Sequence, residues 1–210
     1  MDEFDQKLDI HEESSEEIVE KIPGRDVYET ISSLVSALLV VVLVFTFLVR
    51  LMGVSGPSMI PTLQDGDRLL VVNSLLCGEY EVGDIVIARK ESFDAQPIVK
   101  RVIATEGQEV EIDFENWTVK VDGVLLEEDY INRDVNYDGV NDDRYVWMAS
   151  PTGERVLRFT VEPGKLFVMG DNRNHSTDSR SSTVGQVDER QVLGRVLLRL
   201  FPFSAFGTVE

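Results

Sequence analysis

The feature that most constrains this chain is an apolar run without charged residues, "TISSLVSALLVVVLVFTFLV" at 30–49, bounded by Glu29 and Arg50. An α-helix rises about 1.5 Å per residue, so a run of this length spans the roughly 30 Å hydrocarbon core of a bilayer. A cleaved secretory signal would need a basic leader, a shorter apolar run and a small-residue cleavage site. Because the leader is acidic and the run is long, we predict an uncleaved transmembrane helix over 29–52.

The residues before this helix predict its orientation. The leader "MDEFDQKLDIHEESSEEIVE" has little to bury, so we expect residues 1–28 to form a disordered acidic tail. Lys21 and Arg25 precede the helix, whereas Arg50 follows it and Arg68 lies further on. By the positive-inside rule, this small bias places the tail in the cytoplasm and the remainder of the chain, 53–210, outside it.

Composition excludes several classes of protein. The 210 residues carry a formal charge of −18, whereas a nucleic-acid-binding protein needs clustered Lys and Arg, so we expect no nucleic-acid partner. Cys77 is the only cysteine, which excludes an intrachain disulfide, a CxxC pair and a cysteine-based zinc site. HExxH is absent and the chain has two histidines, so a zinc hydrolase is not indicated.

The sequence after Gly53 predicts an all-β domain. Short β-rich runs alternate with turn residues, and no long amphipathic helix is indicated. A hairpin is predicted at 116–128, where Asp122 and Gly123 suit the positive φ angles of a tight turn. The other predicted strands are 67–73, 83–90, 97–105, 155–161, 165–171 and 194–203.

The few histidines limit the possible general bases. A Ser-His-Asp triad would require His175 to serve Ser58, yet G-x-S-x-G is absent around every serine. A lysine can replace histidine if burial keeps its amine neutral, because its ordinary pKa is near 10.4. Lys100 shares one face of a predicted strand with Ile98 and Val102, which makes it a candidate buried base, although many strand lysines point to solvent.

Two prolines flank the candidate nucleophile in "SGPSMIPTL" (55–63). Pro57 and Pro61 fix their own φ angles and disfavour helix in the residues before them. We therefore expect Ser58 to lie in a rigid bend suited to holding a reactive group.

Four motifs, in order after one membrane helix, closely resemble the conserved boxes of bacterial type I signal peptidases: "SGPSMIPTL", "GDIV", "VKRVI" and "GDNRNHSTDSR". Members of that family are membrane-anchored serine endopeptidases that remove signal peptides from exported proteins. The resemblance runs from about residue 28 to about residue 203, and the single anchor is similar to Gram-positive members. It implies a catalytic domain of β-barrel or sandwich type, no required cofactor, signal peptides as substrates, and a location at membrane lipid near the translocation machinery.

The resemblance also assigns roles to residues of this chain. It implies that Ser58 is the nucleophile and Lys100 the general base. Met59 matches a substrate-pocket residue near the membrane, and Ser176 matches a serine that orients the lysine. His175 occupies a variable position of its motif and is expected to be a surface loop residue. The other matched residues would brace the site: Asp171, Arg173, Asp178 and Arg180.

This chain departs from the family pattern in two places. Gly56 stands where some members place a serine whose hydroxyl helps to form the oxyanion hole, so the backbone N–H of Ser58 and an unidentified second donor must serve here. After Lys100, "KRVIATEGQ" replaces the usual K-R-x-x-G-x-P-G-D, although Gly107 is retained. These differences affect the loop and the substrate preference more than the Ser-Lys pair.

An acidic insertion near 132–146 lies outside the family motifs. Asp134, Asn136, Asp138 and Asp142 occupy positions 1, 3, 5 and 9 of a calcium-type loop. Tyr145 stands where such loops place a bidentate glutamate. The segment is either an insertion ordered by structural calcium or an acidic surface loop.

Two classes of function therefore remain open. The first is the membrane-bound signal peptidase, which the combination of Ser58, Lys100, Ser176 and Asp178 favours. The second is an inactive membrane-anchored surface or binding module with a calcium loop. A self-cleaving Ser-Lys regulator is disfavoured by the membrane anchor and by the lack of a DNA-binding region.

Overall fold

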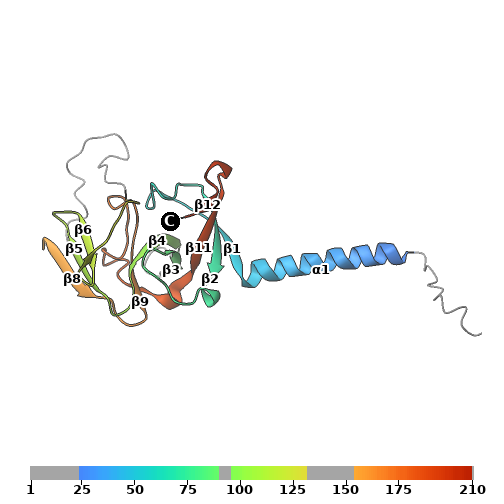
Figure 1. The fold of residues 1–210 in the computed structure, drawn as a ribbon, viewed down its shortest axis with the longest axis horizontal. Helices are drawn as coiled ribbons and strands as arrows, with labels where there is room; N and C mark the ends of the chain where they lie inside the picture. The colour runs from blue at the N-terminus through green and yellow to red at the C-terminus, as the bar shows by residue number, and fades with distance from the viewer. Residues whose placement is uncertain (1–23, 90–95, 132–153, 210) are drawn as a thin grey trace, which may run out of the picture. The chain divides into compact units, whose positions relative to one another are not determined.

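The structure is a computed structural model that describes residues 24–89, 96–131 and 154–209 (Figure 1). The chain divides into two compact units, 1–43 and 44–210. The first contains most of a single long helix, and the second contains the β-sheets.

Helix α1 (Arg25–Phe47) is long and apolar enough to cross a membrane, judged by length and composition. None of its residues is buried, so its apolar side chains are exposed to the medium around the helix. The helix begins at Arg25, within the predicted disordered tail 1–28 and before the predicted start at residue 29, and it ends earlier than the predicted residue 52. Val49 to Gly53 instead form a strand, because their backbone groups pair in register with Arg68 to Asn73.

The larger sheet has eight strands, and its neighbouring strands are antiparallel. Along the sheet they run in the order β1 (Val49–Gly53), β2 (Arg68–Asn73), β11 (Val192–Phe201), β3 (Ile85–Arg89), β4 (Pro97–Ala104), β9 (Lys165–Met169) and β10 (Val187–Asp188), and β12 (Gly207–Thr208) pairs with β11. Within the described parts of its connections lie three short 3₁₀ helices: η2 (Ser74–Leu76), η3 (Glu189–Gln191) and η4 (Phe203–Ala205).

The smaller sheet has four strands, in the order β7 (Val124–Leu125), β6 (Thr118–Val121), β5 (Glu109–Asp113) and β8 (Val156–Thr160). Strands β6 and β7 form the predicted hairpin, with φ of 52° at Asp122 and 78° at Gly123. The Asp122 carboxylate also accepts a hydrogen bond from the Glu109 N–H, which ties the turn to the start of β5.

Strand β4 links the hydrophobic cores. Ile98 and Val102 pack in a cluster with strands β3 and β9, whereas Ile103 and Ala104 pack in the core under the smaller sheet. Val99 contacts a third cluster, built around β2 and the segment that follows β1. The predicted all-β fold is confirmed, although four strands were not among those predicted: β1, β5, β10 and β12.

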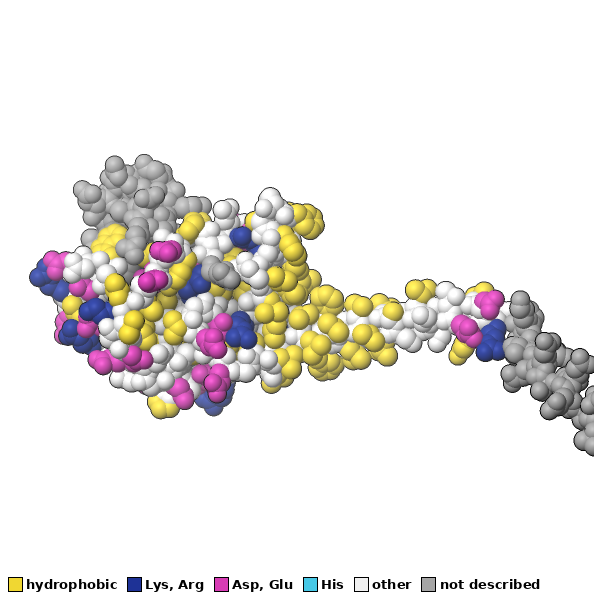
Figure 2. Space-filling view, viewed as in Figure 1, with side chains coloured by type: hydrophobic (Ala, Val, Ile, Leu, Met, Phe, Trp, Pro, Cys, Tyr) yellow, Lys and Arg dark blue, Asp and Glu magenta, His cyan; other side chains and the backbone are white. Residues whose placement is uncertain are grey.

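The outer face of β1, β2 and β11 is apolar. Leu51, Leu70 and Leu198 lie side by side across these strands, and Leu51 is 58% exposed. On the opposite face Leu69 and Val71 are fully buried. Exposed aromatic side chains continue the apolar surface at the end of β11: Phe201, Phe203 and Phe206. Figure 2 shows apolar side chains gathered over this part of the domain, whereas charged side chains gather over β5, β6 and β8.

Candidate active site

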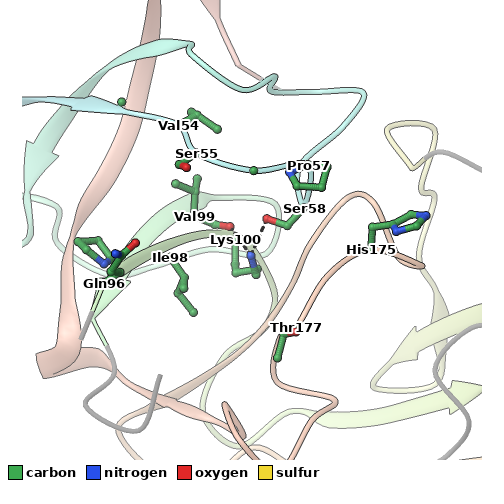
Figure 3. Close-up of a pocket in the computed structure, with 13 residues that line it drawn as sticks. Val54, Ser55, Pro57, Ser58, Gln96, Ile98, Val99, Lys100, His175 and Thr177 are labelled. Atoms are coloured by element: carbon green, nitrogen blue, oxygen red, sulfur yellow. Dashed lines mark hydrogen bonds between the residues drawn. The ribbon is translucent and has the colours of Figure 1, made fainter. Parts of the chain in front are cut away.

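Ser58 and Lys100 meet at the centre of the candidate site. Lys100 Nζ donates hydrogen bonds to Ser58 Oγ at 2.8 Å and to the carbonyl oxygen of Val99 at 2.9 Å (Figure 3). Forty-two positions separate the two residues in the chain, so their contact depends on the fold. The geometry allows direct proton transfer between the hydroxyl and the amine.

Burial adjusts the amine for this role. Lys100 is 4% exposed, and desolvation lowers its pKa to about 8, against the opposing effect of the nearby Asp178 and Asp171 carboxylates. Arg180 lowers the pKa further. A substantial fraction of the amine is therefore neutral at mildly alkaline pH, where it can accept a proton.

The segment that carries Ser58 is held at both ends by backbone hydrogen bonds. The Val54 N–H donates to Asp67 O, and the Gly66 N–H donates to Val54 O. Just beyond the serine, the Leu63 N–H donates to Met59 O. The predicted rigid bend is thus a loop closed by its own backbone.

The 170–180 segment packs directly against the nucleophile. The Asn172 N–H donates to Ser58 O at 3.0 Å, and Asn172 Nδ2 donates to Pro57 O at 3.1 Å. Asn172 of the "GDNR" motif therefore binds two backbone carbonyls of the serine motif, one through its own N–H and one through its side-chain amide.

Asp178 and Arg180 form a fully buried ion pair at 2.8 Å within this segment. Burial opposes ionisation of Asp178, but Arg180 and the Gly170 N–H outweigh it and hold the pKa of the carboxyl below its usual range. Arg180 also donates to Arg173 O, which fixes the turn between them. Both residues also affect the pKa of Lys100, and their bracing role stays a prediction.

Ser176 is buried in the same segment, but its predicted hydrogen bond to Lys100 is not seen. Within the described residues the hydroxyl instead interacts with Asp178, where it helps to lower the pKa of that carboxyl. The hydroxyl can rotate, so the orienting role stays a prediction.

Asp171 lies in a network that the sequence interpretation missed in part. Arg101 donates to both of its carboxylate oxygens, at 2.9 and 2.8 Å, and Thr62 Oγ1 donates to Oδ2 at 2.5 Å. Arg101 follows Lys100 directly, and Thr62 belongs to the serine motif. Asp171 therefore joins three of the four motifs. Arg101 could have been identified from the sequence, because it lies in the "VKRVI" motif.

Glu128 and Tyr130 were also missed, because they lie outside every motif. Glu128 accepts hydrogen bonds from both terminal nitrogens of Arg173, at 3.1 and 2.5 Å. The Tyr130 hydroxyl donates to Glu128 at 3.2 Å, and the Arg101 guanidinium stacks over the Tyr130 ring at 4.0 Å. No pattern in the sequence marks the pair.

The dyad opens into a cavity of about 280 Å³. Val54, Ile98 and Val99 supply apolar walls, and in Figure 3 these lie on one side of Ser58 while His175 lies on the other. His175 lies in a loop and is partly exposed, as expected, and it also lines the cavity.

Met59 also needs correction. Its side chain is 1% exposed and packs with Leu63 and Leu69 in the core, and it is absent from the described residues that line the cavity. An apolar side chain next to the nucleophile turns inward because the adjoining serine faces the cavity. The structure therefore does not place Met59 at the described lining of the cavity, whereas its membrane-proximal position stays a prediction.

The backbone beside the nucleophile can contribute to an oxyanion hole. The Ser58 N–H makes no hydrogen bond to another residue within the described ranges, so it is available to a developing oxyanion. Gly56 has a φ of 88°, and its N–H donates to Asp65 Oδ1 at 2.9 Å. This hydrogen bond fixes the glycine where the family pattern places a serine.

No cluster suited to a metal ion occurs among the described residues. The calcium-type positions Asp134, Asn136, Asp138 and Asp142 lie outside the described residues. Structural calcium at this insertion stays a prediction.

Comparisons with known proteins agree on one family. The family described as signal peptidase, peptidase S26, matches residues 27–201. The chain is 33% identical to signal peptidase IB of Staphylococcus aureus over 184 residues, which cover 87% of this chain and 93% of that protein. It is also 33% identical to a probable signal peptidase I-1 of Synechocystis over 193 residues, 88% of each chain. Among solved structures, a signal peptidase I from Enterococcus faecalis matches with a TM-score of 0.41 at 29% identity, over 57% of this chain and 97% of that chain.

Proposed function

The chain belongs to the signal peptidase family, peptidase S26, and on that premise we propose that it removes signal peptides from exported proteins with Ser58 as nucleophile and Lys100 as base. The observation that carries the assignment of roles is the 2.8 Å hydrogen bond between Lys100 Nζ and Ser58 Oγ, in a cavity open to a peptide. The alternative of an inactive binding module has no observation in its favour.

The proposed reaction is acyl transfer in two steps. In the first, Ser58 Oγ attacks the carbonyl carbon of the scissile peptide bond while neutral Lys100 accepts the hydroxyl proton. The Ser58 N–H stabilises the oxyanion, and the lysine passes the proton to the leaving amine as the C–N bond breaks. In the second step Lys100 takes a proton from a water molecule whose oxygen attacks the ester carbonyl carbon. The bond between that carbon and Ser58 Oγ then breaks, and the lysine returns the proton to Oγ as the acid product leaves.

The proposed substrate is a signal peptide with small residues before the cleaved bond. Val54, Ile98 and Val99 form apolar walls beside Ser58, and such walls suit small aliphatic side chains. Lys100 and His175 are the only ionisable side chains among the described residues that line the cavity. The proposed steps use the Ser58 hydroxyl, the Lys100 amine and water, and no cofactor takes part in the proposed reaction.

We further propose that α1 anchors the enzyme in the cell membrane, with the tail in the cytoplasm and the catalytic domain outside. The slight excess of Lys21 and Arg25 over Arg50 near the helix ends supports this orientation. A domain so placed would meet its substrates as they leave the translocation machinery.

The apolar outer face of β1, β2 and β11 is proposed to rest on membrane lipid. Strand β1 begins two positions after α1 ends, so the chain itself keeps this sheet near the membrane surface. Leu51 and the aromatic side chains at the end of β11 are exposed, and a group of neighbouring exposed apolar side chains is typical of an interaction site. A bilayer is the partner that the neighbouring helix already supplies.

The test is cleavage of a fluorogenic signal-peptide substrate by the full chain in detergent. Wild type should cleave at a single bond after a small residue, and Ser58→Ala should not. An acyl-enzyme trapped on Ser58 by a slow substrate, identified by mass spectrometry, would establish the nucleophile. If wild type cleaves nothing, or if Ser58→Ala cleaves as wild type does, the proposal is wrong.

A further inference from the structure

We propose that Glu128 and Tyr130 are positioning residues, which hold the catalytic segments in place through Arg173 and Arg101. The proposal rests on the proposed function and extends it to residues outside the family motifs. Neither residue is among those described as lining the cavity, so any effect on the reaction must pass through the two arginines.

The contact between Glu128 and Arg173 is bidentate and almost fully buried. The side chains are 2% and 1% exposed, respectively. A buried ion pair adds little stability over apolar side chains of similar volume, because both charges lose their hydration. A paired carboxylate and guanidinium do, however, fix the direction of both groups. The cluster is thus better suited to setting geometry than to adding stability.

Tyr130 extends this cluster to Arg101. The ring of Tyr130 lies 4.0 Å from the Arg101 guanidinium, and its hydroxyl donates to Glu128. This one side chain therefore links Arg101 to the ion pair of Glu128 and Arg173. Burial and the nearby Glu128 raise the pKa of the Tyr130 hydroxyl, which keeps it protonated as a donor. A ring in this place blocks the sideways movement of Arg101.

Each arginine then reaches the catalytic segments. Arg173 Nε donates to Gly170 O at 3.1 Å, and Arg173 O accepts a hydrogen bond from Arg180. Arg101 donates hydrogen bonds to both carboxylate oxygens of Asp171, and Thr62 of the serine motif donates a further hydrogen bond to the same carboxylate. The contacts of both arginines therefore lead to residues 170–173, the stretch that contacts the Ser58 carbonyl.

The test compares Tyr130→Leu, which removes the stacking ring and the hydroxyl, with Tyr130→Phe, which keeps the ring. Both are assayed as the full chain in detergent. A displacement of about 1 Å at the reacting groups can lower the rate by up to about a hundredfold. We expect Tyr130→Leu to lower kcat about tenfold to a hundredfold with KM almost unchanged, and Tyr130→Phe to retain most of kcat.

The pH profile supplies a readout that a purely structural role would not change. Lys100 is surrounded by Asp171, Asp178 and Arg180, and burial is the main cause of its lowered pKa. If the 170–180 segment loosens, water reaches the amine and its pKa rises toward the ordinary value. The alkaline rise of kcat/KM should then shift to higher pH in Tyr130→Leu and stay in place in Tyr130→Phe.

Two control variants separate position from stability and from charge. Val119→Ala opens a cavity in the core under the smaller sheet, and it shows how activity responds to lost stability alone. Glu111→Gln removes ion pairs with Lys120 and Arg158 on the surface of that sheet. Neither control should change kcat of the folded enzyme or its pH profile.

A paired replacement tests whether Glu128 serves only to neutralise Arg173. Glu128→Leu combined with Arg173→Met removes both buried charges. We expect this double variant to fold with near-normal stability, while its kcat remains below that of wild type. Wild-type kcat in this double variant would overturn the proposal. So would a Tyr130→Leu enzyme that matches Val119→Ala in kcat and pH profile. If wild type itself fails to cleave signal peptides, the proposed function fails instead.

Discussion

Gly170 lies against the carbonyl oxygen of Ser58 so closely that a Cβ at position 170 would overlap with that oxygen. The same Cβ would overlap with Oγ of Ser176. The carbonyl belongs to a backbone held by Asn172, so it cannot move aside as a flexible side chain would. The glycine of the "GDNR" motif is therefore needed for close approach between two segments, and no positive φ is involved.

Gly170→Ala should consequently inactivate the enzyme. The added methyl group pushes the 170–180 segment away from Ser58, and we expect kcat to fall about a hundredfold or more. Cleavage assays and thermal unfolding of the full chain in detergent would measure the effect. Val119→Ala provides the comparison at reduced stability, and an active, folded Gly170→Ala enzyme would contradict the predicted overlap.

The identity of the base predicts the pH dependence of cleavage. Because only the neutral amine accepts a proton, kcat/KM should rise with pH and reach half its maximum near pH 8, the pKa of Lys100. Lys100→Ala should lower kcat about a thousandfold or more, whereas His175→Ala should keep the alkaline rise. The base assignment is wrong if His175→Ala abolishes the rise while Lys100→Ala remains active.

The same buried amine should cost stability. Its pKa is about 8 in the folded chain against 10.5 for an ordinary lysine, so the unfolded state binds the proton more tightly. Stability therefore increases as pH rises from about 8 to 10.5. Lys100→Met should be inactive yet more stable than wild type at pH 7, by roughly 1–3 kcal/mol. Denaturant unfolding at pH 7 and pH 10 measures this, and equal gains at both pH values would count against it.

Asp178 should have the opposite effect at acidic pH. Its folded pKa lies below the ordinary 3.8, so its contribution to stability is complete above that pH and is lost as pH falls toward the folded pKa. Asp178→Asn leaves the Arg180 charge buried without its partner, and we expect a loss of about 3–5 kcal/mol at neutral pH. Unfolding curves from pH 2 to 7 would show a smaller acid dependence in the variant. An unchanged acid dependence would exclude the ion pair as its source.

Contact between the apolar outer face and lipid can be read by fluorescence. Phe203 is 81% exposed and packs edge-on against Phe201, with ring centroids 5.7 Å apart. In vesicles that contain brominated lipids, we expect Phe203→Trp to add fluorescence that the lipids quench. Val124→Trp, at an exposed position on the smaller sheet, is the control and should stay unquenched. Equal quenching at both sites would contradict the proposed orientation.

Local patterns predicted much of the fold. The uncharged run indicated α1, and alternation of apolar residues located β2, β3, β4, β8 and β9 within a few residues. Asp122 and Gly123 indicated the hairpin because few other residues adopt its φ angles. The end of α1 was placed too late, since an apolar run cannot distinguish a last helical turn from a strand that pairs with residues further along the chain.

The amino-acid sequence limited the chemistry that this chain can perform. It offered a proline-flanked Ser58, a strand lysine at Lys100, few histidines, and the motifs that point to one family. Only the tertiary structure decided which groups meet, because the dyad, the Gly170 contact and the Arg101 to Asp171 pair join positions distant in the chain. Met59 turned inward and Glu128 became a buried partner for the same reason. Burial and pairing depend on the packing of several segments at once, and no local pattern in the sequence records that packing.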